Sequence, residues 1–167
     1  VVAMAAYNRI GDLQYDAGDW DQAKSSFRAA ITISGSEQQP PQAAAARFSL
    51  AEILYLEEQF RQSLDLYEQE IGLRPETDRI YQLARTGYIC KTVSAGEFLY
   101  RLGEIASAKN NFKELIDYDP AIVEAHRGYI KCAAAAGDIE RTIAVYRQRL
   151  EKAPEEPLWL YTTGLSL

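Results

Sequence analysis

The segment GEIASAKNNFKELIDYDP at residues 103–120 recurs along the chain with the same spacing of residue types. Its counterparts are GDWDQAKSSFRAAITIS from residue 18, EQFRQSLDLYEQEIGLRP from residue 58 and GDIERTIAVYRQRLEKAP from residue 137. In each, an apolar residue is followed by a small residue, an aromatic and an aliphatic, as in Ile105, Ala108, Phe112 and Ile116. Steps of three and four place these positions on one helix face, which must be buried.

Glycine and aspartate mark the predicted helix ends. The pairs Gly18-Asp19 and Gly137-Asp138 join a residue that readily ends a helix in the left-handed conformation to one whose carboxylate can cap the next helix. Asp119-Pro120 predicts a similar start, with proline in the first turn. Because one helix pair cannot cover its own apolar face, stacked neighbours must supply the core.

This pattern resembles the tetratricopeptide repeat, whose period is about 34 residues. The preceding helices agree, with Tyr7-x2-Ile10-Gly11 in the first unit and Gly96 with Tyr100 in the third. The resemblance implies an all-α fold, a right-handed α-solenoid of antiparallel helix pairs (TPR superhelix) with four repeats plus a partial fifth. We expect a single array over residues 1–167, with repeats at 4–35, 44–75, 78–120 and 121–154 and a partial repeat at 157–167.

Some positions depart from the family pattern. Glu70 and Arg149 occupy a slot usually held by alanine, and Ile130 stands where a close-packing glycine is expected. These residues should weaken the local consensus packing without changing the fold.

The spacing between repeats predicts two insertions. The small residues Ala23, Ser63, Ala108 and Thr142 are 40, 45 and 34 positions apart. Six extra residues would turn a helix by about 600° and swing its buried face away, so they should form a loop near residues 35–41. Eleven extra residues turn it by about 1100°, nearly three whole turns, and keep the face in register. We therefore predict one lengthened helix from Asp78 to Leu102 that protrudes beyond the edge of the stack.

Composition narrows the class of protein. The net charge of −6 and pI of about 4.9 disfavour nucleic acid as a partner, and no apolar run is long enough for a membrane span. Cys90 and Cys132 form no CxxC pair and His126 is the single histidine, so we expect no metal site and no cofactor. Two buried or half-buried free thiols favour a reducing, cytoplasmic location. The first residue already lies within a predicted helix, a start that is compatible with an export signal upstream of this sequence.

No catalytic motif is found. The sequence has no GxSxG serine, no phosphate-binding glycine loop and no HExxH. We expect a protein that is not an enzyme, with His126 as an ordinary packed or surface helix residue.

The resemblance implies that the first helix of each pair lines a concave groove. The matching positions are Asn8, Asp12, Tyr15, Phe48, Glu52, Tyr55, Val93, Glu97, Tyr100, Arg127 and Lys131. A row of carboxylates beside a row of tyrosines suits a basic or aromatic linear segment of a partner protein. The same tyrosines are also typical of packing alone, and acidic helix faces are typical of solubility.

The end of the sequence supports an alternative function, a structural element of a longer solenoid or a self-associating array. Trp159, Leu160 and Leu165 would lie on a fifth first helix whose partner helix is missing. Terminal repeats normally present a polar outer face, so we expect these three residues to mediate assembly.

Overall fold

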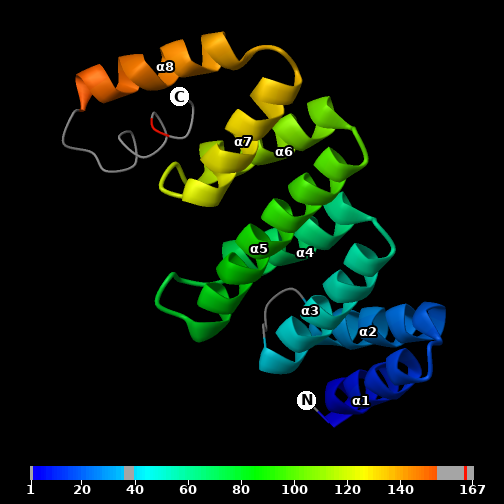
Figure 1. Ribbon diagram of the computed structural model, residues 1–167. Helices are drawn as coiled ribbons and strands as arrows, with labels where there is room; N and C mark the ends of the chain where they lie inside the picture. The colour runs from blue at the N-terminus through cyan, green and yellow to red at the C-terminus, as the bar shows by residue number, and fades with distance from the viewer. Residues whose placement is uncertain (1, 36–39, 154–163, 165–167) are drawn as a thin grey trace. The chain divides into compact units, whose positions relative to one another are not determined.

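The computed structural model describes residues 2–35, 40–153 and 164, and these residues form eight α-helices with no β-strand among them (Figure 1). The helices are α1 (Val2–Asp16), α2 (Trp20–Ser34), α3 (Pro41–Leu56), α4 (Phe60–Gly72), α5 (Arg79–Arg101), α6 (Ile105–Tyr118), α7 (Val123–Ala135) and α8 (Ile139–Lys152). The all-α prediction is confirmed. The chain forms two compact units, residues 1–91 and 92–167, and the continuous helix α5 runs through their boundary.

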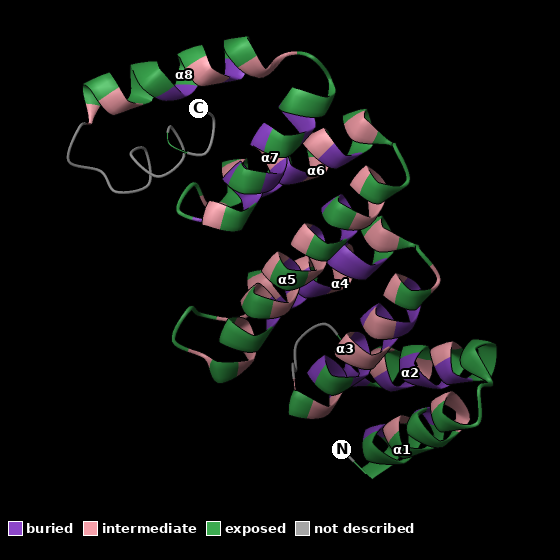
Figure 2. Ribbon diagram, viewed as in Figure 1, coloured by how far each residue is buried: buried purple, intermediate pink, exposed green. Residues whose placement is uncertain are grey.

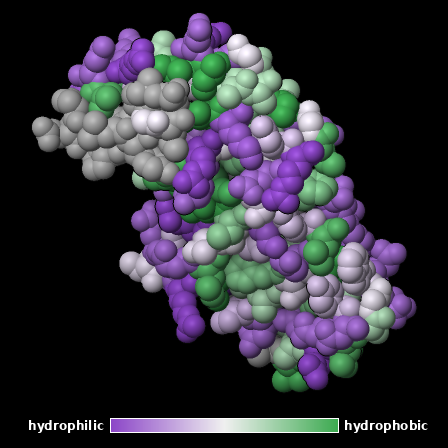
Figure 3. Space-filling model, viewed as in Figure 1, coloured by the Kyte–Doolittle hydropathy of each residue, from purple (hydrophilic) through white to green (hydrophobic). Residues whose placement is uncertain are grey.

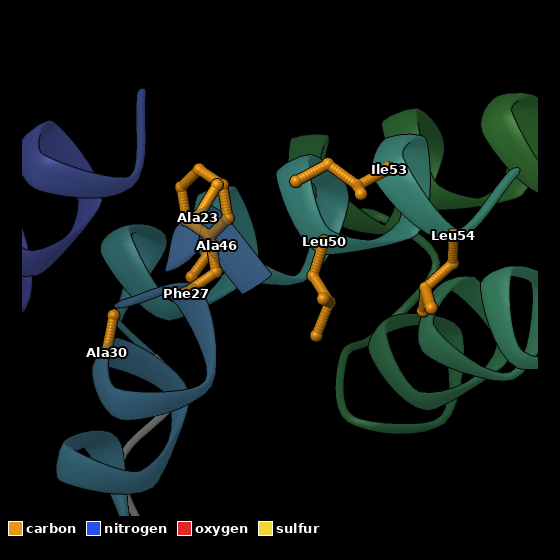
Figure 4. Close-up of a cluster of buried hydrophobic side chains, with 7 residues drawn as sticks. All are labelled: Ala23, Phe27, Ala30, Ala46, Leu50, Ile53 and Leu54. Atoms are coloured by element: carbon orange, nitrogen blue, oxygen red, sulfur yellow. The ribbon is translucent and has the colours of Figure 1, made fainter. Parts of the chain in front are cut away.

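In the first unit, helices adjacent in sequence pack side by side, α1 on α2, α2 on α3 and α3 on α4. Figure 4 shows a cluster of buried side chains from α2 and α3, which combines small and large residues. It contains Ala23, Phe27, Ala30, Ala46, Leu50, Ile53 and Leu54. Figure 2 shows buried residues on the facing sides of the helices and exposed ones outside, as the steps of three and four predict.

The repeated aromatic packs against glycine. A Cβ atom added to Gly11 would lie 2.6 Å from the Phe27 ring, and one added to Gly87 would lie 2.4 Å from Tyr67. In the second unit, a Cβ added to Gly128 would lie 2.4 Å from the Phe112 ring. The aromatic thus fixes how closely the helices approach, because no larger residue fits opposite it.

The predicted turns are confirmed, but their predicted caps are not. Gly18 and Gly137 take the left-handed conformation with φ of 82° and 76°. Asp19 and Asp138 stand at the N-caps of α2 and α8, yet neither side chain bonds a backbone N–H there. The prediction of a helix start at Asp119-Pro120 is also wrong, since α7 begins at Val123 and the Asp119 carboxylate accepts a hydrogen bond from the Ala121 N–H at 2.9 Å.

The lengthened helix is confirmed as one element, α5, with no break over Arg79–Arg101. Asp78 caps it, because Oδ1 accepts the Ile80 N–H at 2.7 Å. This bond is the first cause that lowers the pKa of Asp78, with Arg74 adding to it. Ala84 and Tyr88 in the added turns are buried, so one face of the extension is packed, and its protrusion beyond the edge of the stack stays a prediction. Helix α2 ends at Ser34 and α3 begins at Pro41; the loop predicted for the six-residue insertion falls mainly on residues 36–39, which lie outside the described residues, and it stays a prediction.

A chain of alternating charges crosses the first unit. Arg47 of α3 pairs with Glu70 of α4, and both are buried. The Arg74 Nε donates to the second Glu70 oxygen at 2.8 Å, and its Nη1 donates to Asp78 at 3.2 Å. This chain ties α3 and α4 to the cap of α5, because each carboxylate is held by an arginine.

The second unit carries a different buried polar pair. His126 of α7 is fully buried, with Nδ1 2.6 Å from the Tyr146 hydroxyl and Nε2 2.9 Å from the Pro120 carbonyl oxygen. The carbonyl can only accept, so Nε2 holds the proton and Nδ1 accepts from Tyr146. Burial lowers the pKa of His126 and raises that of Tyr146 to about 12.

The two cysteines differ. Cys132 is buried, and burial raises the pKa of its thiol. Cys90 is exposed, so the prediction of two sheltered thiols is wrong for that residue. Trp159, Leu160 and Leu165 lie outside the described residues, and assembly through them stays a prediction.

Candidate partner-binding surface

The predicted groove residues lie on the first helices of the pairs, and none is fully buried. In the first unit they are Asn8, Asp12 and Tyr15 on α1 with Phe48, Glu52 and Tyr55 on α3. In the second unit they are Val93, Glu97 and Tyr100 on α5 with Arg127 and Lys131 on α7. In the view of Figure 3, hydrophilic and hydrophobic side chains lie interspersed over the described chain. We name these eleven residues the first-helix surface.

A pocket of about 220 Å³ opens between α1 and α3. Asp12 and Tyr15 line one side, Ser49 and Glu52 line the other, and Phe27 of α2 contributes from the neighbouring helix. The structure thus brings three predicted residues together. Glu52 already pairs with Lys91, so the negative charge that the pocket offers comes mainly from Asp12, whose carboxylate beside aromatic rings suits a positively charged side chain.

Three other predicted residues in the first unit serve mainly in packing. The Asn8 Nδ2 donates to the Gln42 carbonyl at 2.8 Å. Phe48 stacks on Tyr67 with ring centroids 5.5 Å apart, and Tyr55 lies 5.2 Å from Phe60. These contacts within the unit account at least partly for the residue types at these three predicted groove positions.

Lys91 reveals what a carboxylate–tyrosine pair can hold. Its ammonium nitrogen lies 2.6 Å from the Glu52 Oε2 and 4.2 Å from the centre of the Tyr55 ring. Glu52 and Tyr55 are three residues apart on α3, so both reach the same cation from one helix face. The sequence pattern did not predict Lys91 here, because its place depends on how the lengthened α5 lies against α3.

The corresponding pair in the second unit also faces a lysine. The Lys131 ammonium lies 4.2 Å from the Tyr100 ring centre, while Glu97 binds Arg101 at 3.4 Å. A pocket of about 100 Å³ brings together all five predicted residues of this unit. It also contains Phe112, Glu124 and Gly128, which the slot pattern did not include.

Asp12 and Tyr15 form the third such pair, with the same three-residue spacing. Tyr15 stacks on Trp20 with ring centroids 6.3 Å apart, and it also lines the pocket. Among the described residues no lysine or arginine contacts Asp12 or Tyr15. This pair therefore has the same helical spacing as the Glu52–Tyr55 pair that holds Lys91, without a cation contact among the described residues.

Neither a metal centre nor a membrane-spanning helix is found in the described parts of the chain. Over residues 2–35 and 40–153, no group of three His, Cys, Asp or Glu side chains is placed to hold a metal ion. Over the same ranges, no helix is both long and apolar enough to cross a membrane.

Comparison with known proteins gives matches to repeat families and to solved structures. Residues 2–76 and residues 95–157 each match a tetratricopeptide repeat model. A comparison with curated proteins finds no match.

Three solved structures of TPR proteins are similar to this chain. YrrB, described as having an unusual peptide-binding site, is 15% identical with a TM-score of 0.41, over 96% of this chain and 74% of its own. TTC0263 of Thermus thermophilus is 17% identical with a TM-score of 0.37, over 98% of both chains. The TPR domain of P58(IPK) is 15% identical with a TM-score of 0.40, over 98% of this chain and 45% of its own. The two repeat matches together span most of the sequence, and the chain belongs to the tetratricopeptide repeat family.

Proposed function

We propose that this chain binds a linear, basic segment of a partner protein on its first-helix surface and has no catalytic activity of its own. Its repeats make it a protein-interaction scaffold, so the proposal concerns what is bound and where. The observation that carries it is the Asp12–Tyr15 pair. It repeats the Glu52–Tyr55 arrangement that holds Lys91, but it faces an open pocket.

The physical basis is local. A lysine or arginine entering this pocket would gain an ion pair with Asp12 and a cation–π contact with Tyr15, as Lys91 does with its own partners. Phe27 and Tyr15 also provide apolar contact for the aliphatic stem of such a side chain. Both contacts are screened by salt, so binding should weaken as ionic strength rises.

The test uses a fluorescein-labelled peptide, GKLKAKLG, and fluorescence anisotropy at low salt. Asp12→Asn should weaken binding by about fivefold, since it removes one ion pair of roughly 1 kcal/mol. Asp16→Asn is the matched control, because Asp16 lies on the same exposed helix, carries the same charge and does not line the pocket. Equal losses in the two variants would contradict the proposal.

A second variant tests whether Lys91 stands in for a ligand. Lys91→Met should strengthen peptide binding, because it frees Glu52 and Tyr55 for an external cation. Unchanged or weaker binding, with unchanged helicity by circular dichroism, would show that the second pair is structural only.

A further inference from the structure

The second unit contains a groove that is separate from the first-helix surface. It lies between α6 and α8, has a volume of about 370 Å³, and reaches Tyr129 of α7. We name it the α6–α8 groove. Its lining residues are Lys109, Lys113, Ile116, Asp117, Tyr129, Asp138, Arg141, Thr142, Val145, Tyr146 and Arg149. The groove shares no lining residue with the pocket of about 100 Å³ that contains Arg127 and Lys131, so the two are distinct.

The charge of this groove is opposite to that of the chain. Two lysines and two arginines face two aspartates, which gives the lining a net charge of +2, whereas the whole chain carries −6. A concave site with an excess of cations attracts anions through its own lining charges, whereas the carboxylate-rich parts of the surface repel them.

The lysines are held in place by internal partners. Lys109 pairs with Asp138 and lies 5.2 Å from the Tyr129 ring centre. Lys113 pairs with Asp117 at 2.6 Å, and that hydrogen bond is the first cause that raises the pKa of Lys113. Both aspartates are therefore already matched by a lysine.

Arg141 and Arg149 are the two other cations of the lining, and Arg141 is the one that we expect to bind an anion. Arg141 is exposed and forms no ion pair or hydrogen bond with any residue in the described part of the chain. Arg149 lies with its guanidinium carbon 5.7 Å from the ring centre of Tyr146, which lines the groove from the same helix. Guanidinium groups bind carboxylates with two parallel hydrogen bonds, which lysine cannot do.

Apolar residues line the same groove. Val145 is 44% exposed although it is a large aliphatic residue, and Ile116 lies on the facing helix. An anion alone would leave these side chains uncovered, whereas an aliphatic side chain beside a carboxylate would cover them.

We propose that the α6–α8 groove binds an acidic linear segment of a partner protein that carries an aliphatic side chain. A carboxylate of this segment pairs with Arg141, and the aliphatic side chain packs on Val145 and Ile116. This site is independent of the basic-segment site at Asp12, and it would let one chain hold two segments of opposite charge.

The test uses a fluorescein-labelled peptide, EELEEL, with KKLKKL for comparison, and fluorescence anisotropy at low salt. Arg141→Gln should weaken EELEEL binding by about tenfold, the loss of one charge-assisted hydrogen-bonded pair. Arg147→Gln is the matched control: it makes the same change in charge on the same helix, outside the groove, and should weaken binding by less than about twofold. Asp12→Asn should leave this binding unchanged, which separates the two proposals.

A third variant, Val145→Asn, tests the apolar contact and should also weaken EELEEL binding while leaving helicity unchanged. Equal effects of Arg141→Gln and Arg147→Gln would overturn the proposal, as would binding of KKLKKL as tight as that of EELEEL. Displacement of the peptide by millimolar inorganic phosphate, with no effect of Val145→Asn, would mean a small-anion site only and would also overturn it.

Discussion

The second and fourth repeats place different residues in the same two slots. In the second, Arg47 and Glu70 form a buried ion pair. In the fourth, the matching residues are His126 and Arg149; the histidine is buried and hydrogen-bonded to Tyr146, while Arg149 is exposed at the surface. Because an arginine cannot form an ion pair with a neutral imidazole, its charge instead helps lower the pKa of His126, after the larger effect of burial. The position in the repeat determines where a side chain lies, whereas the neighbouring side chains determine which contacts it makes.

The largest expected effect comes from Glu70→Ala. It leaves two arginines, Arg47 and Arg74, without their shared carboxylate in a buried place, so we expect a loss of about 3–5 kcal/mol in the free energy of unfolding. Urea unfolding followed by circular dichroism measures it. Arg149→Ala changes the same slot of the fourth repeat and should cost less than about 1 kcal/mol, because Arg149 is exposed. Similar losses for both variants would remove the distinction between the two repeats.

The aromatic slot sharpens the comparison, since Tyr67 packs on Gly87 of α5 whereas Tyr146 bonds His126. Gly87→Ala would place a Cβ 2.4 Å from the Tyr67 ring, so we expect a loss of about 1–3 kcal/mol. Gly72→Ala is the control, because a Cβ there meets nothing within 4 Å and alanine favours the helix. An unchanged urea midpoint for Gly87→Ala would show that α4 and α5 can move apart at little cost.

Removing the hydroxyl group of Tyr146 or of Tyr67 should change stability by less than the substitutions above, and by different amounts. Tyr146→Phe removes the donor to the buried His126 Nδ1 and should cost about 1–2 kcal/mol. Tyr67 has its pKa raised to about 12, first by burial and then by Glu52 and Cys90, but its hydroxyl forms no hydrogen bond within the described chain. Tyr67→Phe should therefore change stability by less than about 0.5 kcal/mol. Thermal melts of the two variants measure both losses. A larger loss for Tyr67→Phe than for Tyr146→Phe would contradict the assigned hydrogen bond to His126.

The smallest effect concerns pH. The folded pKa of His126 is lowered below the ordinary value of 6.5, so the unfolded chain binds more protons than the folded one as pH falls through 6.5. Stability should decrease on acidification from pH 7.5 to 5.5 and be constant above that window for this group. Since His126 is the single histidine, His126→Gln should flatten the profile of the melting temperature. A wild-type profile that is already flat would contradict the buried neutral state.

Much of the fold follows from local sequence. The positions of Ala23, Phe27 and Ile31 on one face, and the register of eleven added residues in α5, depend only on the 3.6-residue period of the helix. Capping was predicted less well: Asp138 pairs with Lys109 across the groove instead of capping α8. A short carboxylate has several possible partners, and the nearest one in the folded protein decides.

For the candidate site, the helices and their faces were predictable from the sequence, but the contacts were not. The spacing of Asp12 with Tyr15 and of Glu52 with Tyr55 was readable, since it lies within one helix. The sequence did not predict that Lys91 contacts the Glu52–Tyr55 pair and not the Asp12–Tyr15 pair. This contact depends on which turn of α5 meets α3.

The repeat, the helices and the family could all be inferred from the order of residues, because hydrophobic periodicity and turn residues act over a few positions. Three features emerge only in the folded chain: one face of the added turns of α5 is buried at Ala84 and Tyr88, Glu70 is held by two arginines, and a basic groove opens between α6 and α8. The physical reason is that ion pairs and cavities depend on distances between helices, which vary by a few ångströms with the side chains that separate them, and a repeat pattern does not encode those distances.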